Sequence, residues 1–336
     1  MKILILGGNG FLGRAAASLF SGRGHAVSAF SRSFSRAGLP AGVKRLTGDR
    51  RNLRDLEKTA ATEDFDLVID NIGFNTGDAA LLAKTFPCKR CFFISASAVY
   101  SILDGTRPPY KEKEPGKFKL KKSESPDYAA YALGKLEAEK ILLKKTECSV
   151  FRLPAVLGPG ERELRLYSYL ARIRDGGPIF LPRKASLKRS FLYSGDFARA
   201  MLAAAEAPWR GAGEVFNITG QAFSLEELVR SCLKILGKKN KIIFLKPEKI
   251  SELGLDFPGI FPFSNREYSV YRDYLDGKKF EKRFSWKPLD PRQWLPKTVN
   301  WFMNDYSGSL PENYKYRKKE MKLFGLKAGG TGAKSL

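Results

Sequence analysis

MKILILGGNGFLG, residues 1–13, is the stretch that decides the fold of this chain. Residues 3–6 form an apolar run without polar alternation, which predicts a parallel strand covered on both faces. Three glycines follow: Gly7 permits a sharp turn, Gly10 lets a pyrophosphate approach the backbone, and Gly13 lets the next helix lie close to the sheet. A strand, a phosphate-binding turn and a helix in this order predict a dinucleotide-binding domain.

The helix expected at residues 14–20 would direct its first backbone amides and its dipole at the diphosphate. The next strand is expected at residues 26–30, and its end distinguishes NAD from NADP. Ser31 and Arg32 follow it, then Ser33 and Arg36, and no carboxylate is present to repel a 2′-phosphate. This pattern favours NADP over NAD, with ordinary loop residues as the alternative interpretation.

Size and composition indicate a folded, soluble protein. The 336 residues suffice for one large domain or two medium ones, and the 43% of hydrophobic residues excludes a disordered chain. No apolar stretch approaches the roughly 18 residues of a membrane span. The apolar run after Lys2 is too short for a signal peptide and lacks a cleavage site. We therefore expect a cytoplasmic protein that does not enter the membrane.

The charge is strongly basic, with 59 Lys and Arg against 35 Asp and Glu and a net charge of +24. Lysines concentrate in residues 111–122, 234–249 and 315–334. These runs suit a nucleic-acid groove, but solvated charge runs or a generally basic proteome would give the same composition. Because the runs are scattered and lack interleaved aromatic residues, nucleic-acid binding is the less favoured interpretation.

The cysteines do not predict a metal site. Cys88 and Cys91 have the spacing of a redox or zinc motif, but there is no second such pair, and His25 is the single histidine. Cys148 and Cys232 stand alone in apolar segments. We expect a reduced, structural pair and no metal.

Strand and helix patterns alternate along the first half of the chain. Strands are expected at residues 43–46, 66–69 and 91–94, with a helix at residues 79–85 before the last of them. This alternation predicts an α/β fold with a doubly wound parallel sheet.

Tyr131 and Lys135 form the candidate catalytic pair, because Tyr-x-x-x-Lys places both side chains on one helical face. A lysine ammonium one turn away lowers the pKa of a phenol from about 10 towards neutrality, so that it can exchange a proton with a substrate while hydride moves to or from a nicotinamide. The same lysine can hold the nicotinamide ribose. The spacing recurs at Tyr274/Lys278 and Tyr314/Lys318, but only Tyr131 follows a serine-bearing strand end and opens a helix with an apolar face.

These features resemble the extended and atypical short-chain dehydrogenases/reductases, the NAD-dependent epimerase/dehydratase family. The resemblance covers about residues 1–305. It is carried by the Gly7-x-x-Gly10-x-x-Gly13 spacing, by the Tyr131/Lys135 pair, and by the segments 150–160, 191–200, 214–228 and 284–301.

The resemblance implies a Rossmann-type sheet with a smaller C-terminal α/β substrate-binding cap. It places Asp49 or Arg50 beside the adenine and residues 70–73 beside the ribose and nicotinamide. The implied cofactor-binding residues are Gly7, Asn9, Gly10, Phe11, Leu12, Gly13, Ser31, Arg32, Asp49, Arg50, Asn71 and Lys135.

The chain departs from the family at the third catalytic position. The resemblance places the usual Ser or Thr at Ala96, and Ser95 and Ser97 flank it. In a regular strand both serines would point away from the face of Ala96. Either the strand twists enough for Ser97, or less readily Ser95, to reach the substrate, or this hydrogen bond is absent and turnover is slower.

The resemblance thus implies an NAD(P)-dependent epimerase, dehydratase or reductase that acts on a nucleotide-linked sugar, with NADP tilting the choice towards a reductase. We expect the Rossmann domain at residues 1–157, with 190–220 partly returning to it, the cap at 158–310 and a basic tail at 311–336. Cap arginines for a diphosphate would be Arg162, Arg165, Arg172 and Arg189, with surface arginines as the alternative. A family-style homodimer is open, and so is an RNA-binding or NADP-sensing protein with weak or no turnover.

Overall fold

The computed structural model describes residues 1–34, 38–87, 90–112, 126–145, 147–182, 185–208, 213–246, 262–263 and 273–322. The chain forms two compact units. The first comprises Met1–Val156, Leu192–Gly220 and Asp273–Pro288, and the second Leu157–Phe191, Gln221–Arg272 and Leu289–Leu336. Residues 273–288, which the sequence analysis assigned to the cap, therefore belong to the first unit. Arg36, Cys88, most of the lysine run 111–122 and residues 323–336 lie outside the described residues.

The first unit is built on a parallel sheet. In the described part of the chain, seven strands lie in the order β10-β6-β5-β4-β1-β2-β3, and every pair is parallel. The predicted doubly wound α/β fold is confirmed. The strands are β1 (Lys2–Leu6), β2 (Ala26–Ser31), β3 (Lys44–Thr47), β4 (Leu67–Asp70), β5 (Arg90–Ala96), β6 (Cys148–Leu153) and β10 (Val215–Asn217).

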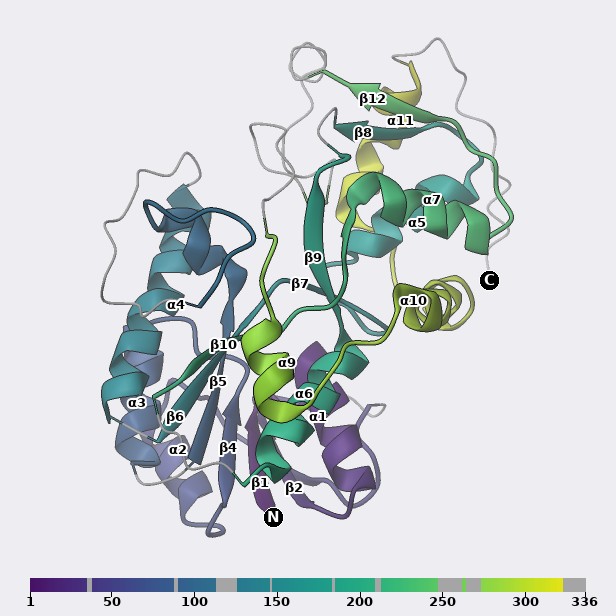
Figure 1. The fold of residues 1–336 in the computed structure, drawn as a ribbon. Coiled ribbons are helices and arrows are strands. Elements are labelled where there is room, and N and C mark those ends of the chain that lie inside the picture. Colours follow the sequence, from purple (N-terminus) through teal and green to yellow (C-terminus); the bar gives the residue numbers. More distant parts are fainter. Residues whose placement is uncertain are drawn as a thin grey trace. The chain divides into compact units, whose positions relative to one another are not determined.

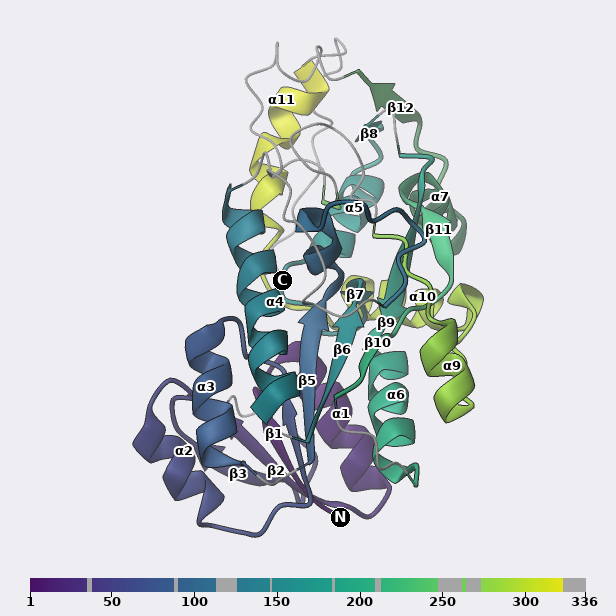
Figure 2. The same cartoon turned by 60° about the vertical axis from the view of Figure 1, so that its left-hand side comes forward.

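Helices cover both faces of this sheet (Figures 1 and 2). Ile3 and Ile5 face one hydrophobic core, which α1, α6 and α9 complete, whereas Leu4 and Leu6 face a second core under α2, α3 and α4. This double burial explains why β1 shows no polar alternation. The helices of the unit are α1 (Phe11–Gly22), α2 (Leu53–Ala60), α3 (Thr76–Thr85), η1 (Ser97–Ile102), α4 (Pro126–Lys145), α6 (Ser194–Glu206) and α9 (Lys278–Phe284).

The second unit is smaller. Strand β9 (Lys188–Tyr193) pairs antiparallel with β11 (Ala222–Ser224), and β8 (Ile179–Pro182) pairs parallel with β12 (Ile242–Leu245). Its helices are α5 (Arg165–Arg174), α7 (Leu225–Ile235), α10 (Pro291–Asn300), η2 (Trp301–Asp305), η3 (Glu312–Tyr316) and α11 (Arg317–Lys322). The short strand β7 (Ala155–Leu157) contains the division between the units. The predicted capping box of α7 is present, because Ser224 and Glu227 bind each other's backbone amides.

The expectation of a tail from residue 311 is wrong for residues 312–322. Arg317 donates to both oxygens of Asp175, at 2.7 and 2.8 Å, and to Glu320 at 3.0 Å. Glu320 also accepts from Arg172 at 2.5 Å. These buried ion pairs hold η3 and α11 against the end of α5, which local sequence composition could not reveal. None of the described helices is both long enough and apolar enough to cross a bilayer.

Candidate cofactor and catalytic site

The glycine turn after β1 is closed by contacts that exclude side chains. Gly7 has φ +80°, and a Cβ added to Gly13 would lie 2.2 Å from the Gly7 carbonyl oxygen. Gly13 thus lets α1 pack directly on the turn, more closely than the sheet contact that the sequence predicted. A Cβ on Gly10 would meet only the Gly7 carbonyl oxygen, at 3.0 Å, among the described residues. The outer side of Gly10 is therefore open to a ligand.

The N-terminus of α1 is suited to an anion. Its N-cap, Gly10, provides no side-chain hydrogen bond, and the first turn contains no acidic residue. The first amides of a helix lack intrahelical partners and carry partial positive charge, so they remain for a bound phosphate. Phe11 and Leu12 pack against the first hydrophobic core, which leaves their backbone amides rather than their side chains for binding.

Asn9 joins this turn to the chain that follows β2. Its Nδ2 donates to the carbonyl oxygen of Ser33 at 2.8 Å, and Ser31 is the last residue of β2. Arg32 is exposed beside them, and the Arg14 guanidinium lies so near Gly38 that an added Cβ there would be 2.9 Å from its Nη1. Cations therefore surround the end of β2, where the sequence placed the 2′-phosphate.

Arg50 forms a buried ion cluster that the sequence analysis missed. Its side chain is 4% exposed, donates to Asp70 at the end of β4, and lies 2.9 Å from the Asp78 carboxylate on α3. Asp49 instead closes its own turn, because its carboxylate accepts the Arg51 amide at 2.9 Å. Arg50 is thus held inside the unit, between the turn after β3 and the end of β4.

Two buried polar atoms at this edge have no hydrogen-bond partner among the described residues. They are Arg50 Nε, a donor, and Asn71 Oδ1, an acceptor. The Asn71 backbone amide is bonded to the Leu6 carbonyl oxygen at 3.2 Å, which fixes Asn71 beside the end of β1. Buried polar groups are normally paired. The open glycine turn, the uncapped helix and these two atoms together fit a dinucleotide at the carboxyl ends of the strands.

Lys135 is buried on α4. It is 2% exposed, and its Nζ donates to the carbonyl oxygens of Gly73 and Ile94, both at 2.7 Å. The ammonium also lies 4.7 Å from the centre of the Phe74 ring. Burial lowers the pKa of Lys135 to about 8, and the negative charge of Asp70 counteracts part of this shift. Two of the three ammonium hydrogens are used by carbonyls, so one remains for a ligand.

Tyr131 lies one helical turn before Lys135 and is 37% exposed. Its ring centre is 6.4 Å from that of Phe74. Helix α4 begins at Pro126, so Tyr131 stands in its second turn rather than at its start as the sequence suggested. The pair combines a solvent-accessible phenol with a desolvated ammonium on one face of a helix.

Contacts connect the glycine turn to this pair. A Cβ added to Gly7 would lie 2.6 Å from Ile72 Cγ2, and the next residue, Gly73, accepts the hydrogen bond from Lys135. The predicted phosphate-binding turn and the predicted catalytic lysine are therefore at the same edge of the sheet. The competing pairs differ: the Tyr314 phenol donates to Asp175 at 2.8 Å, and Tyr274 precedes α9 instead of lying on it.

The serines around Ala96 have different surroundings. Ser95 Oγ donates to Glu139 Oε1 at 2.5 Å, so the alternative that Ser95 serves the substrate is wrong. Strand β5 ends at Ala96, and Ser97 is the first residue of η1. The strand alternation therefore stops before Ser97, which is 5% exposed. A catalytic role for Ser97 remains a prediction.

Glu139 anchors a second buried network that the sequence analysis did not identify. It accepts from Arg152 Nη2 at 2.6 Å, and both side chains are fully buried. Arg152 also donates to the Tyr100 phenol at 3.0 Å, and Tyr100 donates to Asn217 at 2.8 Å. The signal was available, because Glu139 follows Lys135 by the same four residues that separate Lys135 from Tyr131.

Most cap arginines that were expected to bind a diphosphate have partners within the second unit, which favours the alternative of structural arginines. Arg165 donates to Glu161 at 2.6 Å, Arg172 to Glu320 at 2.5 Å and Arg189 to the Phe263 carbonyl oxygen at 2.5 Å, whereas Arg162 is exposed.

The sequence profile of the NAD-dependent epimerase/dehydratase family matches residues 3–81 and 75–219, which together form more than half of the chain. The chain belongs to this family. The family assignment agrees with the parallel sheet and with the resemblance seen in the sequence.

Individual relatives support the same fold. The chain is 23% identical over 304 residues to the chloroplast stem-loop binding protein of 41 kDa b from Arabidopsis thaliana, covering 85% of this chain and 75% of that protein. It is similar to the UDP-glucose 4-epimerase of Bifidobacterium longum in complex with NAD⁺ and UDP (TM-score 0.68, 16% identity, 91% and 99% of the two chains). It is also similar to the UDP-glucuronic acid 4-epimerase of Bacillus cereus in complex with UDP-glucuronic acid and NAD (TM-score 0.66, 20% identity, 91% and 100%).

Proposed function

We propose that this protein is an NAD(P)-dependent oxidoreductase or epimerase that acts on a nucleotide-linked sugar. The observation that carries the proposal is the set of contacts from Gly7 through Ile72 and Gly73 to Lys135. They bring a dinucleotide-binding turn and a Tyr/Lys pair to one edge of the sheet, as hydride-transfer chemistry requires. The solved relatives named above were crystallised with NAD and with UDP or UDP-glucuronic acid, which supports this substrate class.

In this proposal Tyr131 exchanges a proton with a sugar hydroxyl or carbonyl through its accessible phenol. A bound nicotinamide supplies the hydride acceptor or donor. Lys135 stabilises the phenolate by its charge and offers its remaining ammonium hydrogen to a ribose hydroxyl. The carbonyls of Gly73 and Ile94 hold the ammonium in place. Ser97 donates to the substrate oxygen in place of the side chain missing at Ala96.

We further propose a preference for NADP. Ser31 and Arg32 end β2 without a carboxylate, and Asn9 fixes the chain beside them. An arginine in this place accommodates the 2′-phosphate of NADP. Calorimetry should give a lower dissociation constant for NADP than for NAD, and Arg32→Ala should remove the difference. Equal affinities in the unsubstituted protein would contradict the preference but leave dinucleotide binding intact.

Turnover of a panel of nucleotide sugars with NADPH, NADP or NAD tests the proposed activity. Tyr131→Phe should abolish turnover while cofactor affinity is retained, and Tyr274→Phe, which removes a phenol from the competing motif, should leave turnover unchanged. Equal activity of Tyr131→Phe and the unsubstituted protein would remove Tyr131 from the mechanism. Cofactor binding without any turnover would instead indicate an NADP-sensing protein.

RNA binding is the second candidate function. The chain carries a net charge of +24, and alanine stands at the usual Ser or Thr position. The name of its Arabidopsis relative describes stem-loop binding. Fluorescence anisotropy with a labelled RNA oligonucleotide tests this candidate, and affinity should fall steeply with salt. Salt-independent or absent binding would exclude it.

A further inference from the structure

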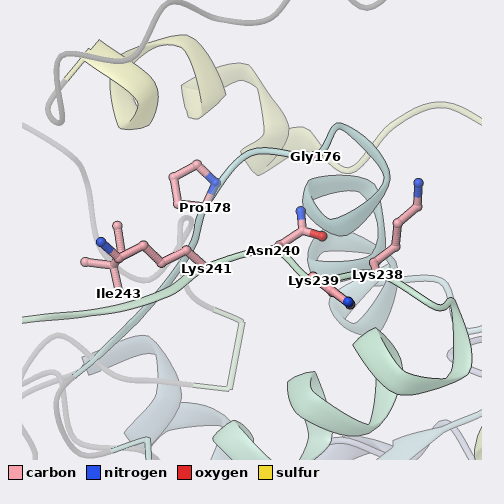
Figure 3. A pocket seen from close by; sticks show the side chains of 7 residues that line it. All are labelled: Gly176, Pro178, Lys238, Lys239, Asn240, Lys241 and Ile243. Carbon is pink, nitrogen blue, oxygen red and sulfur yellow. The ribbon is translucent and has the colours of Figure 1, made fainter.

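The second unit contains a basic pocket with a cavity of about 520 Å³ between the turn after α5 and the chain that enters β12 (Figure 3). Lys238, Lys239 and Lys241 line it, together with Pro178 and Ile243. All three lysines are exposed. The pocket therefore combines three cations with an apolar surface.

Asn240, which also lines the pocket, holds this segment rigidly. Its side-chain Nδ2 donates to the carbonyl oxygens of Arg172, Ile173 and Gly177 at 3.4, 3.1 and 2.8 Å, so it caps the last turn of α5. The Lys241 carbonyl oxygen accepts the Ile179 amide at 2.8 Å, which pins the other side of the segment. The lysines thus extend from a fixed backbone, and an anion that binds them does not have to order a loop.

The positive charge of this pocket is not neutralised within the described residues. Lys238, Lys239 and Lys241 form no ion pair there. The nearby carboxylate of Asp175 is occupied by Arg317, which donates to both of its oxygens. A ligand of this pocket must therefore be an anion.

We propose that this basic pocket binds the phosphates of single-stranded RNA. The inference rests on the second candidate function and gives it a site. The three lysines supply the phosphate contacts, and Asn240 Oδ1, which none of the three amide bonds uses, is an acceptor for a ribose hydroxyl or a base amino group. Pro178 and Ile243 supply the apolar surface that an unpaired base covers and that a bare phosphate does not need. A pocket of this volume accommodates one nucleotide unit.

The test compares two triple variants of the full chain. Lys238→Gln/Lys239→Gln/Lys241→Gln removes the pocket charges. The control Lys278→Gln/Lys282→Gln/Lys287→Gln removes the same charge from exposed positions in the first unit. Affinity for a labelled single-stranded RNA is measured by anisotropy between about 50 and 200 mM salt, a range over which counterion release is resolved. Thermal unfolding verifies that both variants are folded.

The pocket variant should bind RNA at least about tenfold more weakly than the unsubstituted protein, and its salt slope should be shallower by about 2, since each phosphate contact on a single strand contributes roughly 0.7. The control should stay within about twofold. Equal losses in both variants, or no loss in the pocket variant, would overturn the site while RNA binding itself stands. If the unsubstituted protein binds no RNA, whether or not it binds phosphatidylserine vesicles, both the site and the RNA function are overturned.

Discussion

Replacing Glu139 by glutamine tests the buried network under the candidate catalytic helix. Glu139 and Arg152 are both fully buried, and the carboxylate accepts two hydrogen bonds from the guanidinium, at 3.1 and 2.6 Å. Glutamine nearly preserves the volume but removes the negative charge, so Arg152 keeps only the Tyr100 phenol as a side-chain partner among those described. Leaving a buried charge uncompensated costs about 3–5 kcal/mol of unfolding free energy.

Equilibrium unfolding in urea, followed by circular dichroism, measures this loss. Glu137→Gln is the matched control on the same helix, because Glu137 pairs with Lys140 at the surface, where an ion pair contributes about 0–1 kcal/mol. Replacing both buried partners, as in Glu139→Leu/Arg152→Met, should recover most of the stability. A loss below about 1 kcal/mol for Glu139→Gln, or a double variant less stable than the single one, would refute the argument from buried charge.

The same substitution also has an expected effect on the catalytic pair. The negative charge of Glu139 raises the pKa of Lys135, against the larger effect of burial that lowers it to about 8. Glu139→Gln should therefore lower this pKa further and move the alkaline limb of any pH–rate profile to lower pH. A folded variant with an unshifted profile would show that Glu139 supports only the fold.

Three further predictions concern other parts of the chain. Ala96→Ser restores the hydroxyl of the family pattern and should raise kcat several-fold, since one hydrogen bond contributes about 1 kcal/mol to the transition state; an unchanged kcat would mean that Ser97 already fulfils this role. Because burial lowers the pKa of Lys135 from 10.5 to about 8, the unfolded chain binds more protons than the folded one between these values, and stability gains from this group as pH rises through that window. Lys135→Met should lack this gain when unfolding free energies at about pH 7 and about pH 10 are compared. Glu320→Gln should lower the melting temperature because it leaves Arg172 and Arg317 without a shared carboxylate, whereas the exposed Glu312→Gln should not.

The sequence predicted those parts of the fold that depend on local pattern. The apolar residues 3–6 predicted a strand buried on both faces, and Ile3 and Leu4 indeed face different cores. Gly7 was predicted to turn the chain, and its φ of +80° requires a residue without a Cβ. These features could be predicted because a few neighbouring residues determine each of them.

The sequence could not predict the partners of buried charges. Arg50 appeared as an adenine contact, yet its side chain reaches Asp70, twenty residues later, through a contact that exists only in the folded sheet. Ser95 was open as an alternative to Ser97 until its bond to Glu139 was seen. Such pairings depend on which strands become neighbours, and local sequence spacing contains no information about this.

The buried charges also explain where the net charge of +24 is located. Arg50 and Lys135 balance Asp70 and Asp78, and Arg152 balances Glu139. Since these buried groups cancel, the positive excess belongs to exposed residues. A surface with this excess attracts any polyanion through long-range electrostatics, whatever the local geometry. RNA affinity alone therefore cannot identify a site, and only the difference between lysine substitutions in the basic pocket and the same number of substitutions elsewhere separates a built site from the general field of the protein.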